Sequence, residues 1–229
     1  MTRLAPGRVT RWAAGDGGLA AGEATMTQAA ALEAMPSVGL YAVELDGVAY
    51  EVERVGSRYC SVADLRAYGK RAGDDFADET KYPADEVMDA IQAAEETIEE
   101  CCRRSFCERA RDVLLPAGAA LVELPEQDVR SLSAGTLVGD RQAVNSTGAD
   151  ATARMVYGAR AGESIRRACC KLAASYLRAR VGAENARGTS VDGVYVSYEL
   201  ATGEEGSWTG LPEVDAVIAR NRSRRRLVV

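Results

Sequence analysis

The sequence predicts an α+β subunit: a small helical bundle with an inserted antiparallel β subdomain, an N-terminal β-hairpin arm and an extended C-terminal segment. Segments with apolar residues at three-to-four spacing indicate helices, and shorter runs between glycines and prolines indicate strands. An Asp-Gly turn joins two alternating runs early in the chain. The 229 residues, 47% of them hydrophobic and 27% charged, suffice for a core.

Residues 1–57 are predicted to form an N-terminal arm. Residues 1 to about 36 are rich in Gly, Ala and Thr and poor in large apolar side chains, which favours a poorly ordered or partner-dependent segment. Residues 40–55 then alternate around Asp46-Gly47, a turn typical of a type I′ hairpin. This register pairs Leu45 with Val48, Val43 with Tyr50 and Tyr41 with Val52.

One face of this hairpin is apolar and needs a cover, because an isolated hairpin is only marginally stable. The cover is either the main domain or a neighbouring subunit. The residues expected to make a ring or neighbour contact are Tyr41, Val43, Tyr50 and Val52.

Four helices are predicted in the main domain, over 61–69, 83–106, 162–181 and 212–221. Ser61 and Asp64 form a capping-box pattern for the first helix, and Gly69 and Gly73 are expected to break it. The second helix begins at Pro83 and carries an apolar stripe. The opposite side is predicted to be an acidic face, and it comprises Glu95, Glu96, Glu99 and Glu100.

A small antiparallel β subdomain is predicted over about 110–158, inserted between helices. Short β-like runs there are separated by proline and glycine. The runs are 112–115, 119–124, 128–133 and 153–157. A further strand signal covers 191–200, after the third helix.

The sequence contains no histidine, which excludes Ser-His-Asp and Cys-His catalysis, His-ligated metals and an imidazole general base. The six cysteines lack the CxxC spacing of zinc sites, so we expect reduced and partly buried thiols. No phosphate-binding glycine motif and no membrane-spanning apolar run occur. We therefore predict no catalytic residues, no cofactor, no metal and no membrane partner; a hydrolase with paired carboxylates is a distant alternative.

Basic residues gather at the end of the chain. The last eleven residues hold five arginines and no acid, so with a total charge of −6 the other 218 residues carry −11. Such a tail, residues 223–229 with the arginines just before it, suits either DNA phosphates or an acidic protein surface. The acidic body disfavours nucleic acid, so a protein partner is preferred.

Several motifs resemble those of tailed-phage head-tail connector proteins, also called head-to-tail adaptors. The second helix ends in Cys102-Arg103-Arg104-Ser105-Phe106, which is similar to the family's alanine-rich helix followed by Arg-x-Phe. Three further features agree with the family and in its order: a β run over 114–124 that closes on Leu-Pro, the segment 190–194, and the ending 210–218. The resemblance covers about residues 58–222, whereas residues 1–57 depart from the family.

The resemblance implies a non-enzymatic virion component at the capsid-tail junction, made in the cytoplasm of the bacterial host. Such subunits form a ring, commonly twelvefold, beneath the portal protein. The ring contacts a stopper, head-completion or tail-terminator protein, and genomic DNA passes through it without sequence-specific binding. In such a ring the acidic face of the second helix would line the channel or contact another subunit. The alternative is a nucleic-acid-binding accessory protein that uses the arginine tail.

By position, the resemblance also implies a portal-docking segment near the C-terminus. Its residues are Pro212, Val214, Val217, Ile218, Arg220, Arg222, Arg224, Arg225 and Arg226.

Overall fold

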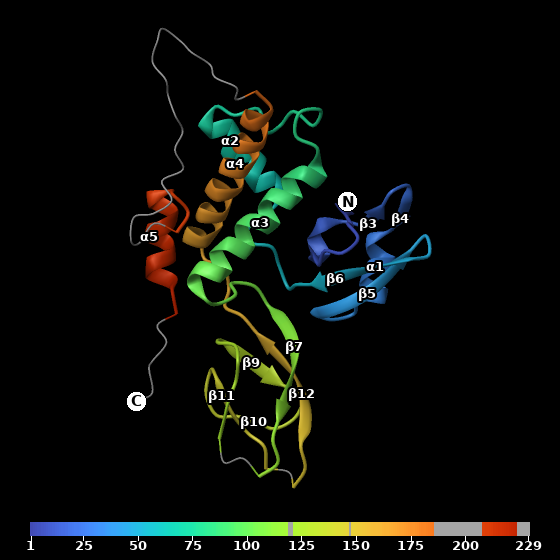
Figure 1. The fold of residues 1–229 in the computed structure, drawn as a ribbon, viewed down its shortest axis with the longest axis vertical. Helices are drawn as coiled ribbons and strands as arrows, with labels where there is room; N and C mark the ends of the chain where they lie inside the picture. Colours follow the sequence, from blue (N-terminus) through green and yellow to red (C-terminus); the bar gives the residue numbers. More distant parts are fainter. Residues whose placement is uncertain (119–120, 147, 186–207, 224–229) are drawn as a thin grey trace. The chain divides into compact units, whose positions relative to one another are not determined.

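The structure is a computed structural model, and it describes residues 1–118, 121–146, 148–185 and 208–223 (Figure 1). The chain divides into two compact units. Unit 1 comprises Met1–Tyr59 and Arg104–Ala161, and unit 2 comprises Cys60–Arg103 and Gly162–Val229. The combination of helices with small, mostly antiparallel sheets confirms the predicted α+β class. The strand expected over 191–200 lies outside the described residues.

The hairpin has the predicted register. Strands β5 (Gly39–Leu45) and β6 (Val48–Arg54) are antiparallel, and Leu45 pairs with Val48, as expected. Asp46 and Gly47 both have positive φ, 52° and 73°, which a type I′ turn requires. Strand β2 (Thr10–Trp12) extends this sheet by pairing in parallel with β6.

The prediction that residues 1 to about 36 are poorly ordered is wrong. They form β1 (Thr2–Arg3), β3 (Leu19–Ala21), β4 (Ala24–Met26), the short 3₁₀ helix η1 (Ala14–Asp16) and α1 (Gln28–Ala34), besides β2. The segment has few large apolar residues, but those it has are buried: Leu4, Trp12, Leu19 and Met35 pack with the hairpin in one core. The segment is ordered because it covers the hairpin's apolar face.

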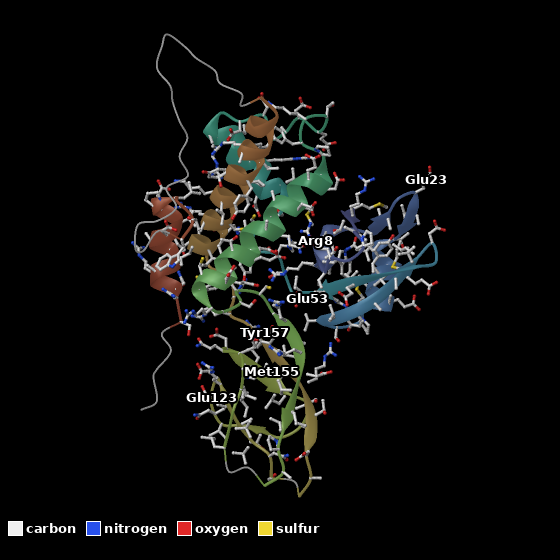
Figure 2. All side chains as sticks on the ribbon, viewed as in Figure 1. Arg8, Glu23, Glu53, Glu123, Met155 and Tyr157 are labelled. Carbon is white, nitrogen blue, oxygen red and sulfur yellow. The ribbon has the colours of Figure 1, made fainter. Side chains whose placement is uncertain are left out.

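The β insertion of unit 1 holds two three-stranded antiparallel sheets. One has the order β7-β12-β9, from β7 (Arg109–Leu115), β12 (Ala151–Tyr157) and β9 (Val129–Leu132). The other has the order β10-β11-β8, from β10 (Thr136–Leu137), β11 (Gln142–Val144) and β8 (Val122–Glu123). Side chains from both sheets form the core of the insertion. Leu115 and Leu124 are buried there with Met155 and Tyr157, which Figure 2 labels on β12.

Unit 2 is a four-helix unit made of α2 (Val62–Ala72), α3 (Ala84–Cys102), α4 (Glu163–Asn185) and α5 (Pro212–Asn221). In Figure 1, α3 and α4 run beside each other and α5 lies against α4. Helix α2 packs on α3 and α4. Among the described residues, no helix is both long enough and apolar enough to cross a membrane.

Three helix ends differ from the predicted ones. Helix α4 continues to Asn185, four residues past the predicted end at 181. The capping box of Ser61 and Asp64 opens α2 as expected, but the helix continues past Gly69 to Ala72. A Cβ at Gly69 would lie 2.3 Å from the Phe76 ring, so this glycine allows close packing, while Gly73, with φ 83°, ends the helix. Helix α3 ends at Cys102, not near residue 106, because Arg103 adopts the left-handed conformation.

Candidate functional site

Three cysteines of unit 2, Cys60, Cys169 and Cys170, form a buried thiol cluster. The structure has all six cysteines free and five of them buried, which confirms the predicted burial, while the reduced state stays a prediction. The Cys60 thiol donates a hydrogen bond to Cys169 Sγ at 3.5 Å, and this bond, together with burial, raises the pKa of Cys60. The pKa of Cys170 is raised as well, through its hydrogen bond with Cys60 and its burial. Because the thiolate is the reactive form, these sulfurs are poor nucleophiles.

No other cluster suggests metal chemistry. Within the ranges that the structure describes, no group of three or more Cys, Asp or Glu side chains is arranged to hold a metal ion. In the acidic stretch after α2, Asp74 pairs with Arg178 at 2.5 Å and Glu79 pairs with Arg66 at 2.6 Å. The candidate functional features are therefore surfaces of the two units.

Helix α5 is fixed to unit 2 at both of its ends. Val214 and Ile218 are 1% and 0% exposed, so they belong to the core of the unit. At the first turn, buried Asp215 accepts hydrogen bonds from the backbone N–H and the hydroxyl of Thr209, at 2.9 and 2.8 Å. Beyond the last turn, the Ser223 N–H donates to the Cys102 carbonyl at 2.9 Å.

The other residues of the predicted portal-docking segment face away from this core. Pro212, Arg220 and Arg222 are exposed and Val217 is half-buried. The Arg222 guanidinium lies 5.3 Å from the centroid of the Trp208 ring, where a cation–π interaction is favourable. Arg224, Arg225 and Arg226 lie outside the described residues.

The acidic face of α3 differs from the predicted one at Glu95. This side chain is only 1% exposed, because it neighbours the buried stripe that includes Ile91 and Ile98. Glu96 and Glu100 are exposed and Glu99 is half-buried. Asp89 was not predicted to belong to this face but is exposed; it lies seven residues before Glu96, a spacing that places both on one side of a helix.

The predicted neighbour-contact residues of the hairpin are split between core and surface. Val43 and Val52 are 3% and 0% exposed and pack with residues of the N-terminal segment. Tyr41 and Tyr50 are partly buried against the same core, and the Tyr41 hydroxyl donates to the Ser37 carbonyl at 2.8 Å. Only the two tyrosines therefore present side-chain surface outside the chain's own core.

A cavity of about 310 Å³ lies where α2, α4 and α5 meet in unit 2. The residues that line it are Tyr68, Arg71, Ala72, Arg167, Lys171 and Glu213. Lys171 Nζ lies 2.6 Å from Glu213 Oε2, and Arg167 Nε lies 3.5 Å from Glu163 Oε1 at the same surface. The sequence did not predict this cavity, because no local pattern links three helices that lie so far apart in the chain.

Two acidic side chains of unit 1, Glu53 and Asp16, lie in ion pairs that are largely buried. Glu53, labelled in Figure 2, is held by Arg109 through two hydrogen bonds of 2.6 and 2.8 Å, and Arg11 Nε lies 3.6 Å from it. Asp16 pairs with Arg58 at 3.7 Å, and burial raises the pKa of this aspartate although the guanidinium opposes the shift. These pairs are nearly inaccessible to solvent, so they serve the unit's own structure.

Comparisons with solved structures give weak likenesses, which include two particle necks. No family model matches the sequence, and no curated protein matches it. The neck of a native GTA particle computed with C12 symmetry is 17% identical with a TM-score of 0.42, over 83% of this chain and 98% of that one. The neck of an empty GTA particle computed with C6 symmetry is 17% identical with a TM-score of 0.41, over 73% and 91%. At these TM-scores the likeness carries no conclusion about function.

Proposed function

We propose that this chain is a structural subunit of a tailed-phage head-tail connector. It would form an adaptor ring that joins the portal to the tail or neck and extends the DNA channel. The observation that carries the proposal is the anchored C-terminal helix: α5 buries Val214 and Ile218 in unit 2 and leaves its basic end exposed. A helix fixed in this way offers Arg220 and Arg222 to a partner without unfolding the unit that holds it.

The Arg-x-Phe motif supports the proposal through its structural role. Phe106 is 3% exposed and packs edge-to-face on Tyr59, whose hydroxyl accepts a hydrogen bond from the Phe106 N–H at 2.7 Å. The Arg104 guanidinium lies 5.4 Å from the Phe106 ring centroid and binds Asp128 at 2.7 Å. The residues that resemble the connector motif therefore pack within unit 1, with Phe106 buried and Arg104 partly exposed, as expected of a motif with a structural role.

The proposed subunit has no catalytic role. Its partners are the portal protein, a stopper or tail-terminator protein and further copies of itself, and genomic DNA passes without sequence-specific contact. An acidic body suits such passage, because like charge keeps the phosphates from adhering to the wall. Within the proposal, Pro212, Val217, Arg220 and Arg222 face the portal, while Val214 and Ile218 hold the helix in place.

Electron microscopy of the full chain mixed with portal tests this function. We expect a ring seated on one end of the portal. The double variant Arg220→Ser/Arg222→Ser should lose attachment and keep the fold, and extending it with Arg224→Ser, Arg225→Ser and Arg226→Ser should complete the loss. The matched control removes the same two charges at exposed positions of unit 1, as Arg3→Ser/Arg8→Ser, and should bind portal normally.

Two outcomes would overturn the proposal. One is a wild-type chain that stays monomeric and has no affinity for portal. The other is tight duplex binding that weakens steeply with salt, disappears in the same arginine variants and occurs without any ring, which would favour the nucleic-acid alternative.

A further inference from the structure

The cavity between α2, α4 and α5 is a basic pocket that the proposed portal contact does not use. Its lining holds three cations, Arg71, Arg167 and Lys171, against one acid, Glu213. Glu213 is paired with Lys171, so the contact between them leaves the two guanidinium groups to set the charge of the opening. Tyr68 and Ala72 add an apolar wall. A lining of this kind fits a carboxylate on a short aliphatic stem.

Most of the pocket's charge is available to an incoming group. Arg71 is exposed, and no ion pair of this side chain is found in the part of the chain that the structure describes. Arg167 is 78% exposed, and its contact with Glu163 is a surface pair one helical turn away, of the kind that contributes little. A carboxylate brought between the two arginines would be bound by planar donors suited to bidentate contact.

The same unit carries the complementary group on another helix. Asp89, Glu96 and Glu100 are exposed along one side of α3, at spacings of seven and four residues. Glu96 is oriented by the Gln92 amide, which donates to its Oε1 at 2.8 Å. We call these three residues the acidic stripe. It lies on the side of α3 opposite Ile91 and Ile98, which face the helices of the unit's core.

We propose that the basic pocket of one copy receives the acidic stripe of the next copy, with Glu96 and Glu100 entering between Arg71 and Arg167. This inference rests on the proposed ring and specifies its subunit contact. A contact between two different patches of identical chains is head-to-tail, and it closes into a ring when the rotation allows. The pocket and the stripe are two such patches, with opposite charge.

A second copy fits the pocket better than a nucleic acid does. Glu213 at the rim and Glu163 beside Arg167 would repel a phosphate backbone. The stripe instead offers separated single carboxylates, each of which can be placed against a guanidinium and away from these acids. This assignment also gives the α3 face an intersubunit role rather than a role in lining the channel.

Charge reversal in pairs tests the contact by sedimentation velocity of the full chain in the presence of portal. The pocket variant is Arg71→Glu/Arg167→Glu, which leaves the Lys171–Glu213 pair intact, and the stripe variant is Glu96→Lys/Glu100→Lys. Each alone should associate at least tenfold more weakly than the wild type. The control matched to the stripe variant is Glu44→Lys/Glu51→Lys. It makes the same charge change at exposed positions on the hairpin and should leave association unchanged.

Mixing the pocket variant with the stripe variant is the decisive test. When the two variants alternate, the acidic pocket of the pocket variant meets the basic stripe of the stripe variant. The basic pocket of the stripe variant meets the acidic stripe of the pocket variant. A ring with an even number of subunits should therefore assemble again. Recovery in the mixture supports the contact, whereas wild-type assembly by either variant alone, or no recovery by folded variants, overturns it.

The outcomes also separate this inference from the proposed function. If the wild type forms a ring on the portal and both reversed variants do too, the inference fails and the adaptor function stands. If the wild type never associates, the function itself fails. If the pocket variant loses affinity for a DNA duplex in fluorescence anisotropy while both variants still assemble, the pocket is a phosphate site and the inference is overturned.

Discussion

The two units of this protein treat their charged side chains differently. In unit 1, Glu53 lies between Arg109 and Arg11 with 10% of its side chain exposed, and the ion pair is closed within the unit. In unit 2 the Arg178–Asp74 pair is more open, with 45% of the Arg178 side chain exposed, and cations gather at the basic pocket and acids along α3. Buried pairs hold a unit together, whereas separated charges of opposite sign are suited to binding a neighbour.

The largest expected effect breaks the closed network of unit 1. Glu53→Gln leaves the buried Arg11 and the half-buried Arg109 side chains without their carboxylate, and removing one partner of a buried pair costs about 3–5 kcal/mol. The free energy of unfolding in urea, followed by Trp12 fluorescence in a Trp208→Phe background, measures the change. Glu51→Gln, exposed on the same strand, is the control; equal stability of the two variants would contradict the buried network.

The second largest effect is expected in the core of unit 2, where Gly69 packs against the Phe76 ring. Gly69→Ala places a methyl group against the Phe76 ring, and such overpacking costs about 1–3 kcal/mol. Unfolding followed by Trp208 fluorescence in a Trp12→Phe background checks this. The double variant Gly69→Ala/Phe76→Leu should recover part of the loss, and a neutral Gly69→Ala would show that the close approach is unimportant.

A smaller effect comes from the start of α2. The Ser61 hydroxyl accepts a hydrogen bond from the Asp64 N–H at 3.1 Å, and Ser61→Ala should cost about 0.5–2 kcal/mol. Ser61→Asp, which restores an acceptor at the cap, should recover most of it. Thermal unfolding of the wild type and the two variants measures the change in stability. An unchanged stability in Ser61→Ala would show that the cap does not stabilise α2.

The same cap gives a pH dependence of known sign. The hydrogen bond from the Ser61 N–H holds the pKa of Asp64 below its ordinary value. A folded pKa below the unfolded one means that the stabilisation is present above the unfolded pKa and is lost as the pH falls through the folded pKa. Asp64→Asn should therefore lose stability at neutral pH and approach the wild type in acid, by urea unfolding at several pH values. A constant difference between the two proteins would contradict this assignment.

The smallest expected loss of stability is at an exposed acid of unit 2, for comparison with the buried Glu53 of unit 1. Glu100→Gln makes the same chemical change as Glu53→Gln, but at an exposed position of the acidic stripe, so stability should change by less than about 0.5 kcal/mol. Urea unfolding of this variant beside Glu53→Gln measures the contrast. A large loss in Glu100→Gln would mean that the stripe serves the fold of unit 2.

The sequence predicted those parts of the fold that depend on local signals. The Asp46-Gly47 turn set the register of the hairpin, and the Ser61 capping box placed the start of α2. Residues 1 to about 36 were mistaken for a poorly ordered arm, because each of their short elements contributes only one or two apolar side chains, such as Trp12, to the core. Strands β10 and β11, of two and three residues, are too short to show alternation.

The candidate site was harder to predict because it depends on tertiary contacts. Helical spacing placed Glu95 with the other acids of α3, but packing of α3 against three helices buries a wider stripe than the apolar residues mark. Gly69 was mistaken for a helix breaker because only the fold reveals Phe76 against it. The basic pocket joins residues 68–72 with 167–171 and 213, and no local pattern connects these segments.

Zero-length carbodiimide cross-linking tests the central claim, that unit 2 joins neighbouring copies through opposite charges, most directly. The chain has three lysines, Lys70, Lys81 and Lys171, so few products are possible. Unlabelled and ¹⁵N-labelled chains are mixed, assembled on portal, cross-linked and examined by mass spectrometry. Lys171–Glu213, at 2.6 Å within one chain, is the internal reference. We expect mixed-isotope peptides that join Lys70 or Lys171 to Glu96 or Glu100; rings that give the reference link without these peptides would contradict the claim.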